Sequence, residues 1–181
     1  MSEAREALLA LLRRDAYKEG RFKLASGRES DFFIDCKRVM LTAEGHRLIG
    51  AVLCDEVAAL PVDAVAGVAL GGCPLASAVS LTSALRGRGL DALYVRKEAK
   101  DHGTGRRVEG SVAPGARVAL VEDVLTTGGS SRAAVEALRA EGYVVAHVLA
   151  LIDRAEGATE ALAAAGVAAK ALFHRRDFIK G

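Results

Sequence analysis

Several residue types are missing or scarce in this 181-residue chain. It contains no tryptophan, no asparagine and no glutamine, and its cysteines are Cys36, Cys54 and Cys73. Because these cysteines are odd in number, far apart and without Cys-x-x-Cys spacing, they predict neither a disulfide framework nor a zinc site. The lack of thermolabile amides suits a thermophile's protein, although a biased genomic composition would produce the same pattern.

Long apolar runs and a large excess of one charge are also missing. No run approaches the ~20 apolar residues of a membrane-spanning helix. The segment MSEAREALLALLRRD is too acidic and amphipathic for a signal peptide. A net charge of +2 is too small to indicate nucleic-acid binding. We therefore expect a cytoplasmic protein that binds neither membranes nor nucleic acid.

The composition and periodicity that are present predict one globular domain over residues 1–181. The chain opens with an amphipathic helix at 3–14 and a short hairpin made of 21–25 and 31–36. From residue 43 helices and strands alternate, which predicts an α/β fold with a central parallel sheet flanked by helices. The expected helices span 43–59, 74–87, 130–141 and 155–165, and the expected strands span 63–69, 91–96, 116–122, 143–152 and 168–173.

Residues 118–131 combine an apolar strand, two adjacent acids and a turn rich in hydroxyls and glycines. Residues 118–121 carry no polar side chain, as expected of a strand covered on both faces. Glu122 and Asp123 follow at the carboxyl end, where they can accept hydrogen bonds from vicinal hydroxyls or help to hold a hydrated cation. Residues 126–131 lead into a helix, and glycines at a helix amino end suit a phosphate monoester.

Two common nucleotide motifs are absent. Neither the P-loop spacing nor the Gly-x-Gly-x-x-Gly pattern occurs, which disfavours ATP and NAD. The order of apolar strand, acid pair and T-T-G-G-S-S instead resembles the phosphoribosyl pyrophosphate (PRPP) motif of the type I phosphoribosyltransferases; an ordinary strand, turn and capped helix is the alternative. The resemblance implies these PRPP-binding residues: Glu122, Asp123, Val124, Leu125, Thr126, Thr127, Gly128, Gly129 and Ser130.

A long polar connection, residues 97–115, separates two expected strands. It is too long for an ordinary turn, and beside a phosphate site its cations could close over a leaving pyrophosphate; a solvated excursion is the alternative. The segment YVRKEAKDHGTG resembles the flexible catalytic loop of orotate phosphoribosyltransferases, with Arg96, Lys97, Lys100 and His102 on its four cationic positions. These four are further implied PRPP contacts. In that family the loop reaches into the neighbouring subunit, which implies a homodimer.

Two further segments agree with this resemblance. Residues 22–35, FKLASGRESDFFID, resemble the N-terminal signature of the family, and Phe32 and Phe33 take the aromatic positions that border the orotate pocket. Arg154 takes the position of an arginine that contacts orotate, and its planar guanidinium suits a carboxylate. Taken alone, two adjacent phenylalanines would more often belong to the core, and Arg154 would be an ordinary cation at a strand end.

The resemblance covers about residues 20–157 and implies an N-terminal hood of helix plus hairpin over 1–40, followed by a core over 41–181. Two positions depart from the family. Many relatives carry a lysine where this chain has Ala25, and several carry one where it has Gly71. Pyrophosphate would then depend more on backbone amides near Gly71, on Mg²⁺ and on the loop, and weaker PRPP affinity is the expected cost.

Together these features predict transfer of the 5-phosphoribosyl group from PRPP to orotate in de novo pyrimidine (UMP) biosynthesis, with Mg²⁺ held mainly through PRPP. Two alternatives stay open: a phosphoribosyltransferase for another base, and a non-catalytic PRPP-sensing regulator. The implied catalytic residues are Lys100, His102, Arg96 and Asp123, and the implied orotate contacts are Thr126, Arg154, Phe32 and Phe33.

Overall fold

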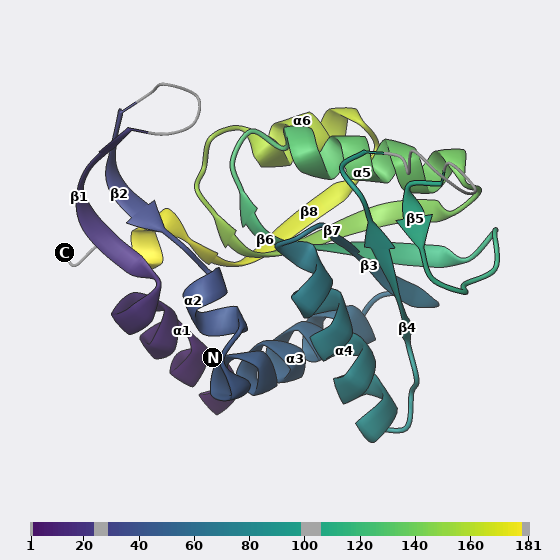
Figure 1. The fold of residues 1–181 in the computed structure, drawn as a ribbon, viewed down its shortest axis with the longest axis horizontal. Coiled ribbons are helices and arrows are strands. Elements are labelled where there is room, and N and C mark those ends of the chain that lie inside the picture. Colours follow the sequence, from purple (N-terminus) through teal and green to yellow (C-terminus); the bar gives the residue numbers. More distant parts are fainter. Residues whose placement is uncertain (1, 24–28, 99–105, 179–181) are drawn as a thin grey trace.

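A six-stranded sheet forms the centre of the protein (Figure 1). The computed structural model describes residues 2–23, 29–98 and 106–178. The sheet has the order β5-β4-β3-β6-β7-β8 and is parallel except for β5, which pairs antiparallel with β4. Its strands are β3 (Ala64–Val68), β4 (Asp91–Val95), β5 (Val108–Glu109), β6 (Arg117–Leu125), β7 (Val144–Asp153) and β8 (Ala168–His174). The predicted α/β fold is confirmed.

Helices cover both faces of this sheet (Figure 1). One face carries α3 (Ala43–Ala58) and α4 (Gly72–Leu85), and the other carries α5 (Gly129–Ala140) and α6 (Ala158–Ala164). Because successive side chains of a strand point to opposite faces, one strand contributes to two cores. Val65 of β3 packs in the cluster that contains Ile49 of α3, whereas Ala66 packs in the cluster that contains Leu138 of α5.

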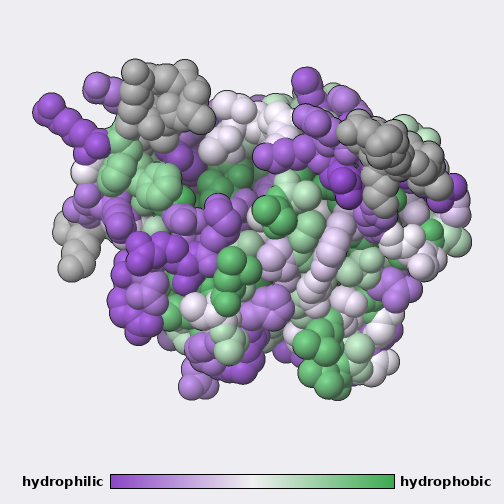
Figure 2. All heavy atoms as spheres, in the orientation of Figure 1, coloured by the Kyte–Doolittle hydropathy of each residue, from purple (hydrophilic) through white to green (hydrophobic). Residues whose placement is uncertain are grey.

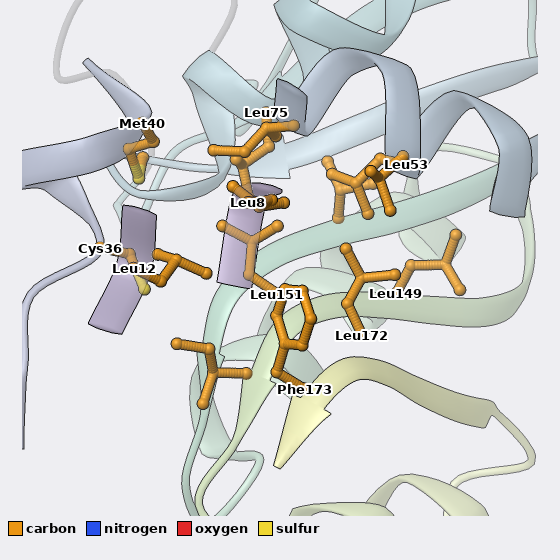
Figure 3. Packing of buried hydrophobic residues seen from close by; sticks show 14 of the residues in the cluster. Leu8, Leu12, Cys36, Met40, Leu53, Leu75, Leu149, Leu151, Leu172 and Phe173 are labelled. Carbon is orange, nitrogen blue, oxygen red and sulfur yellow. The ribbon is translucent and has the colours of Figure 1, made fainter. Parts of the chain in front are cut away.

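The N-terminal segment packs against the edge of the sheet and shares one of these cores. It consists of α1 (Glu3–Asp15), the antiparallel hairpin of β1 (Tyr17–Lys23) and β2 (Glu29–Ile34), and the short helix α2 (Lys37–Met40). Leu8 and Leu12 of α1 are fully buried in the same cluster as Leu151 of β7 and Phe173 of β8 (Figure 3). Apolar burial therefore holds the hood on the sheet.

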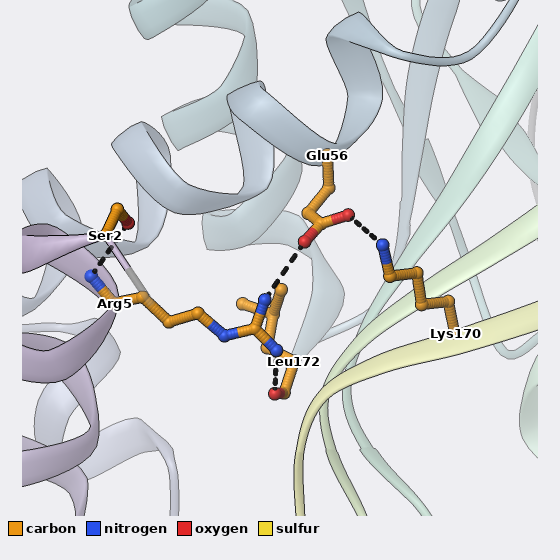
Figure 4. A network of polar contacts seen from close by, with 5 residues as sticks. All are labelled: Ser2, Arg5, Glu56, Lys170 and Leu172. Atoms are coloured by element: carbon orange, nitrogen blue, oxygen red, sulfur yellow. Dashed lines mark hydrogen bonds and ion pairs between the residues drawn. The ribbon is translucent and has the colours of Figure 1, made fainter.

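A small polar network adds to this attachment (Figure 4). Arg5 of α1 lies 3.2 Å from the carboxylate of Glu56 of α3, and Lys170 of β8 binds the other oxygen of the same carboxylate. The Arg5 guanidinium also donates to the Leu172 carbonyl. One half-buried carboxylate with two cationic partners thus joins three elements that are far apart in the sequence.

Some element boundaries differ from the predicted ones. The helix predicted over 155–165 is the shorter α6, because Ala155 (φ 58°) and Gly157 (φ 97°) adopt left-handed backbone conformations that a right-handed helix does not contain. Helix α4 begins two residues earlier than predicted, at Gly72. The two-residue β5, the four-residue α2 and the 3-10 turn Arg175–Asp177 are too short to produce a recognisable periodicity. No helix within the described part of the chain is both long and apolar enough to cross a membrane.

Candidate active site

The carboxyl ends of β3, β6 and β7 meet at one edge of the sheet, because these strands are direct neighbours. Gly71 follows β3, Glu122 and Asp123 lie near the end of β6, and Arg154 follows β7. The backbone N–H of Arg154 donates to the Leu125 carbonyl of β6 at 3.0 Å, which fixes the two strand ends side by side. In α/β sheets this edge is the usual place for a ligand.

The acid pair lies within a strand rather than after it. The strand predicted to end at residue 122 continues to Leu125, so Glu122 and Asp123 alternate in direction. Glu122 is buried, with 5% of its surface exposed, whereas Asp123 is half-buried. The Glu122 carboxylate accepts from the Asp123 N–H at 3.1 Å, and the Asp123 carboxylate accepts from the Val124 N–H at 2.9 Å. Backbone amides therefore orient both carboxylates.

Burial changes the chemistry of Glu122. Desolvation, followed by the neighbouring Asp123, raises the pKa of Glu122 to about 8, although the charge of Lys97 acts in the opposite direction. Burial therefore favours the neutral, protonated form of the Glu122 side chain. The protonated form of a carboxyl can donate one hydrogen bond as well as accept others, which matches the needs of a neighbouring hydroxyl group.

The turn after β3 packs tightly against this acid pair. A Cβ atom on Gly71 would lie 2.6 Å from an Asp123 carboxylate oxygen, and one on Gly72 would lie 2.6 Å from the Val121 carbonyl. The Ala69–Leu70 peptide bond between strand and turn is cis. At Gly71 the Asp123 carboxylate occupies the space that any side chain would need, so the glycine suits this position of Asp123.

The turn between β6 and α5 has the conformation expected of an anion cradle. Gly128 adopts a left-handed conformation with φ 80°, and no side chain caps the start of the helix at Gly129. A Cβ atom on Gly128 would lie 3.2 Å from the Ala158 Cα, so α6 closes the space behind the turn. The Ser131 hydroxyl is buried and has no hydrogen-bond partner among the described residues. These donors at a helix amino end suit a phosphate.

A second group of side chains gathers around Phe32 of β2. The Arg154 guanidinium lies 4.6 Å from the centre of the Phe32 ring and pairs with Glu156 at 2.9 Å. Phe33 points to the opposite side of the hairpin, is 41% exposed and lies 5.5 Å from the Phe22 ring. The structure therefore brings Arg154 and Phe32 together, and it separates the two phenylalanines by strand alternation.

Two cations near this site do not follow from the sequence motifs. The Arg175 guanidinium lies 4.8 Å from the centre of the same Phe32 ring. Lys37, the first residue of α2, pairs with Asp35 at 3.2 Å, and Asp35 first and Asp123 to a lesser extent raise its pKa. Arg175 follows the strand predicted to end at 173, as Arg154 follows its own strand. Arg154 was selected from the family resemblance, and no motif of that resemblance includes Arg175.

The cationic positions of the long connection are only partly described. Arg96 and Lys97 follow β4 directly and are exposed, and Arg96 lies 3.5 Å from Glu109 of β5. Lys100 and His102 fall outside the described residues, as does Ala25. Their predicted roles stay predictions. Within the described ranges no cluster of three or more histidine, cysteine, aspartate or glutamate side chains could hold a metal ion.

Known proteins resemble this chain over nearly its whole length. Residues 45–167 match the phosphoribosyl transferase domain. An orotate phosphoribosyltransferase of Sorangium cellulosum is 61% identical over 97% of this chain and 93% of its own. The orotate phosphoribosyltransferase of Mycobacterium tuberculosis, solved with Fe(III) dicitrate, superimposes with a TM-score of 0.85 at 39% identity, covering 97% of this chain and 98% of that one.

A second structure of the Mycobacterium tuberculosis enzyme, in complex with PRPP, has a TM-score of 0.81 at 32% identity and covers 99% of this chain and 93% of that one. The similarity in sequence and the similarity in fold thus lead to one assignment, which is also the one predicted from the motifs. This chain belongs to the orotate phosphoribosyltransferase family.

Proposed function

We propose that this protein transfers the 5-phosphoribosyl group of PRPP to orotate, giving orotidine 5-phosphate and pyrophosphate in pyrimidine biosynthesis. One observation carries the proposal: an anion cradle, an acid pair and a guanidinium over an aromatic ring meet at a single sheet edge. The first two suit PRPP, and the third suits a planar base with a carboxylate. The reaction belongs to cytoplasmic metabolism, so a cytoplasmic location is part of the proposal.

The donor binds along β6 and the start of α5. The 5-phosphate accepts hydrogen bonds from the amides and hydroxyls of residues 126–130, where the helix amino end is open. The ribose hydroxyls bind Glu122 and Asp123, while Val124 and Leu125 contribute backbone between the two groups. This arrangement fixes the ribose C1 atom in the crevice and orients it toward the base.

Mg²⁺ fits this site as a partner of the donor. Among the described residues the Asp123 carboxylate can contribute an oxygen, Glu122 favours its neutral form because it is buried, and no cluster of three acidic, thiol or imidazole groups is present. A six-coordinate Mg²⁺ would therefore take its other oxygens from PRPP and water. When bound, the ion neutralises charge on the pyrophosphate. Asp123 is then the side chain that orients the ribose and the ion together.

The chemical step breaks the bond between C1 and the pyrophosphate oxygen and forms a bond from C1 to N1 of orotate on the opposite face. The N1–H bond of orotate also breaks, and its proton goes to the leaving pyrophosphate or to water. The electron pair of the broken bond leaves with pyrophosphate, so catalysis requires positive charge at the leaving group. Arg96 and Lys97 follow the β4 strand end and supply part of this charge. Lys100 and His102 are assigned to the same task from their positions in the loop motif.

The acceptor binds between the sheet and the hood. Arg154 pairs with the orotate carboxylate, and its guanidinium keeps its orientation because it lies over the Phe32 ring. Thr126 stands where the donor cradle meets the end of β7, since Leu125 opposes Asp153 in the sheet. Phe33 lies on the outer side of the hairpin, and its predicted place at the border of the orotate pocket stays a prediction.

A homodimer that shares the loop is also part of the proposal. Leu81 and Leu85 on α4 are 59% and 80% exposed, and Tyr94 of β4 is 38% exposed. Figure 2 shows a hydrophobic area over the lower end of α4. A second copy would bury this area. Mixing Lys100→Ala with Asp123→Asn tests the sharing: recovered activity supports it, and a mixture no more active than its parts contradicts it.

The activity is tested with PRPP, Mg²⁺ and a panel of orotate, uracil, adenine and hypoxanthine, each incubated with the full chain. We expect loss of the orotate absorbance band and formation of orotidine 5-phosphate, because Arg154 selects a carboxylate. Consumption of a purine with orotate untouched would identify a different base. If PRPP binds but no base is consumed, the chain is a sensor and not an enzyme.

A further inference from the structure

The described residues on either side of the long connection form a stem. The Arg96 N–H donates to the Arg107 carbonyl at 2.8 Å, and the Arg107 guanidinium donates back to the Arg96 carbonyl at 3.2 Å. The pairing continues into the sheet, where Val95 opposes Val108 in the β4–β5 ladder. The backbone of Arg96, a proposed leaving-group cation, is therefore held by Arg107.

The second half of this stem is anchored by the residue that ends α5. One carboxylate oxygen of Glu141 accepts from the N–H of Arg107 at 3.1 Å and from the N–H of Val108 at 3.0 Å. Helix α5 and the start of β5 lie side by side in Figure 1. Ionised acceptors make stronger hydrogen bonds than neutral ones, so Glu141 fixes these two amides firmly.

Two further contacts hold the chain beyond β5 on the turn after α5. The Tyr143 hydroxyl donates to the Val112 carbonyl at 2.9 Å, and the Gly115 N–H donates to the Gly142 carbonyl at 2.8 Å. These contacts attach Val112 and Gly115, which come after β5, whereas Glu141 holds the amides of Arg107 and Val108 themselves. Loss of the Glu141 carboxylate would therefore release the stem while the rest of the segment keeps its attachment.

We propose that Glu141 is a positioning residue for the proposed leaving-group cations. Glu141 holds the amide of Arg107, and the carbonyl and side chain of Arg107 in turn hold the backbone of Arg96. Lys97 directly follows Arg96 and is positioned with it. Helix α5 begins at the phosphate cradle and Glu141 directly follows its last residue, so α5 connects both halves of the donor site. The inference rests on the proposed function, because it assigns Glu141 a role only if Arg96 and Lys97 stabilise pyrophosphate.

The experiment compares Glu141→Ala, Glu141→Gln and the control Glu136→Ala in the full chain, with PRPP, Mg²⁺ and orotate. Glu136 is an exposed glutamate of the same helix, 3.8 Å from Arg132, so its replacement removes the same charge and leaves the stem unchanged. We expect kcat to fall about tenfold in Glu141→Ala. The KM for orotate should stay within about twofold, because the acceptor groups are untouched.

The glutamine variant separates positioning from charge. Its amide oxygen can accept from both N–H groups, so Glu141→Gln should restore most of the kcat lost in the alanine variant. Equal kcat in Glu141→Ala and Glu136→Ala would overturn the inference, and so would a glutamine variant as slow as the alanine one. Failure of the wild-type chain to consume orotate would instead overturn the proposed function.

A second pair of variants covers the case in which Glu141→Ala does not fold. Arg107→Met removes the side-chain bond to the Arg96 carbonyl and leaves both Glu141 bonds, while Arg106→Met removes the same charge from an exposed neighbour. We expect a lower kcat in the Arg107 variant. Equal rates in the two variants would show that the stem does not position Arg96.

Discussion

The donor side and the acceptor side of this site are built in different ways. The part of the donor side that holds the ribose and the 5-phosphate is one continuous segment, residues 122–131, in which a strand end, a left-handed glycine and a helix start follow one another. The acceptor side brings together Phe32 of β2, Arg154 after β7 and Arg175 after β8. Donor binding therefore depends on local backbone conformation, whereas acceptor binding depends on how the hood packs on the sheet.

Because the two sides are built differently, substitutions on each side should affect the binding of a different substrate. A substitution within the donor segment acts on the binding of PRPP without altering the packing of the hood. A substitution at the hood interface, where Arg5 of α1 contacts Glu56 of α3 and the Leu172 carbonyl of β8, should affect the acceptor through the hairpin that carries Phe32. Three sets of variants can break or sharpen this comparison.

The largest effect is expected at Asp123. Asp123→Asn removes the charge that orients the ribose and its Mg²⁺, so kcat/KM for PRPP should fall about 100-fold, equivalent to ~3 kcal/mol. Steady-state kinetics measure the loss. Asp63→Asn is the matched control, because Asp63 pairs with Arg117 next to the amino ends of β3 and β6. Similar kinetics for both variants would show that Asp123 does not take part in donor binding.

The raised pKa of Glu122 predicts a pH-dependent stability. Its pKa rises from 4.5 unfolded to about 8 folded, so the native state binds more protons between these values. The contribution of Glu122 to the free energy of unfolding is therefore fully present below about pH 4.5. It is lost as the pH rises toward 8, by at most ~1.4 kcal/mol per pH unit. Urea unfolding should show that Glu122→Gln, whose side chain stays neutral, loses less stability than the wild type as the pH rises. Parallel pH profiles for this variant, the wild type and the exposed control Glu136→Gln would contradict the assignment.

The smallest effect is expected at Arg175, on the acceptor side. If its guanidinium adds positive charge around the Phe32 ring where the orotate carboxylate binds, Arg175→Met should raise the KM for orotate about fivefold, ~1 kcal/mol, and leave the KM for PRPP unchanged. Arg176→Met is the control, because the adjacent Arg176 is exposed. Equal orotate KM values for both variants would show that Arg175 does not contribute to orotate binding, and the acceptor side would then consist of Phe32 and Arg154.

Much of this architecture could be predicted from the sequence. Apolar strands such as residues 118–121 are buried on both faces, and such strands produce a pattern that does not depend on distant contacts. The family and the fold, predicted from the same segments, are confirmed. The short elements β5 and α2 could not be predicted, because two to four residues contain too little periodicity. Arg175 was missed because no motif includes it.

The order of residues by itself determined the donor segment, since a strand, a glycine turn and a helix start are local structures that a short stretch of chain specifies. It also determined the identity of Glu122 but not its protonation, because a raised pKa requires neighbours that exclude water. Only the tertiary structure decided that Phe32 meets Arg154 and Arg175 while Phe33 faces away. Only the tertiary structure placed Glu141 beneath the stem of the loop. These contacts join residues far apart in the chain, and folding alone brings such residues together.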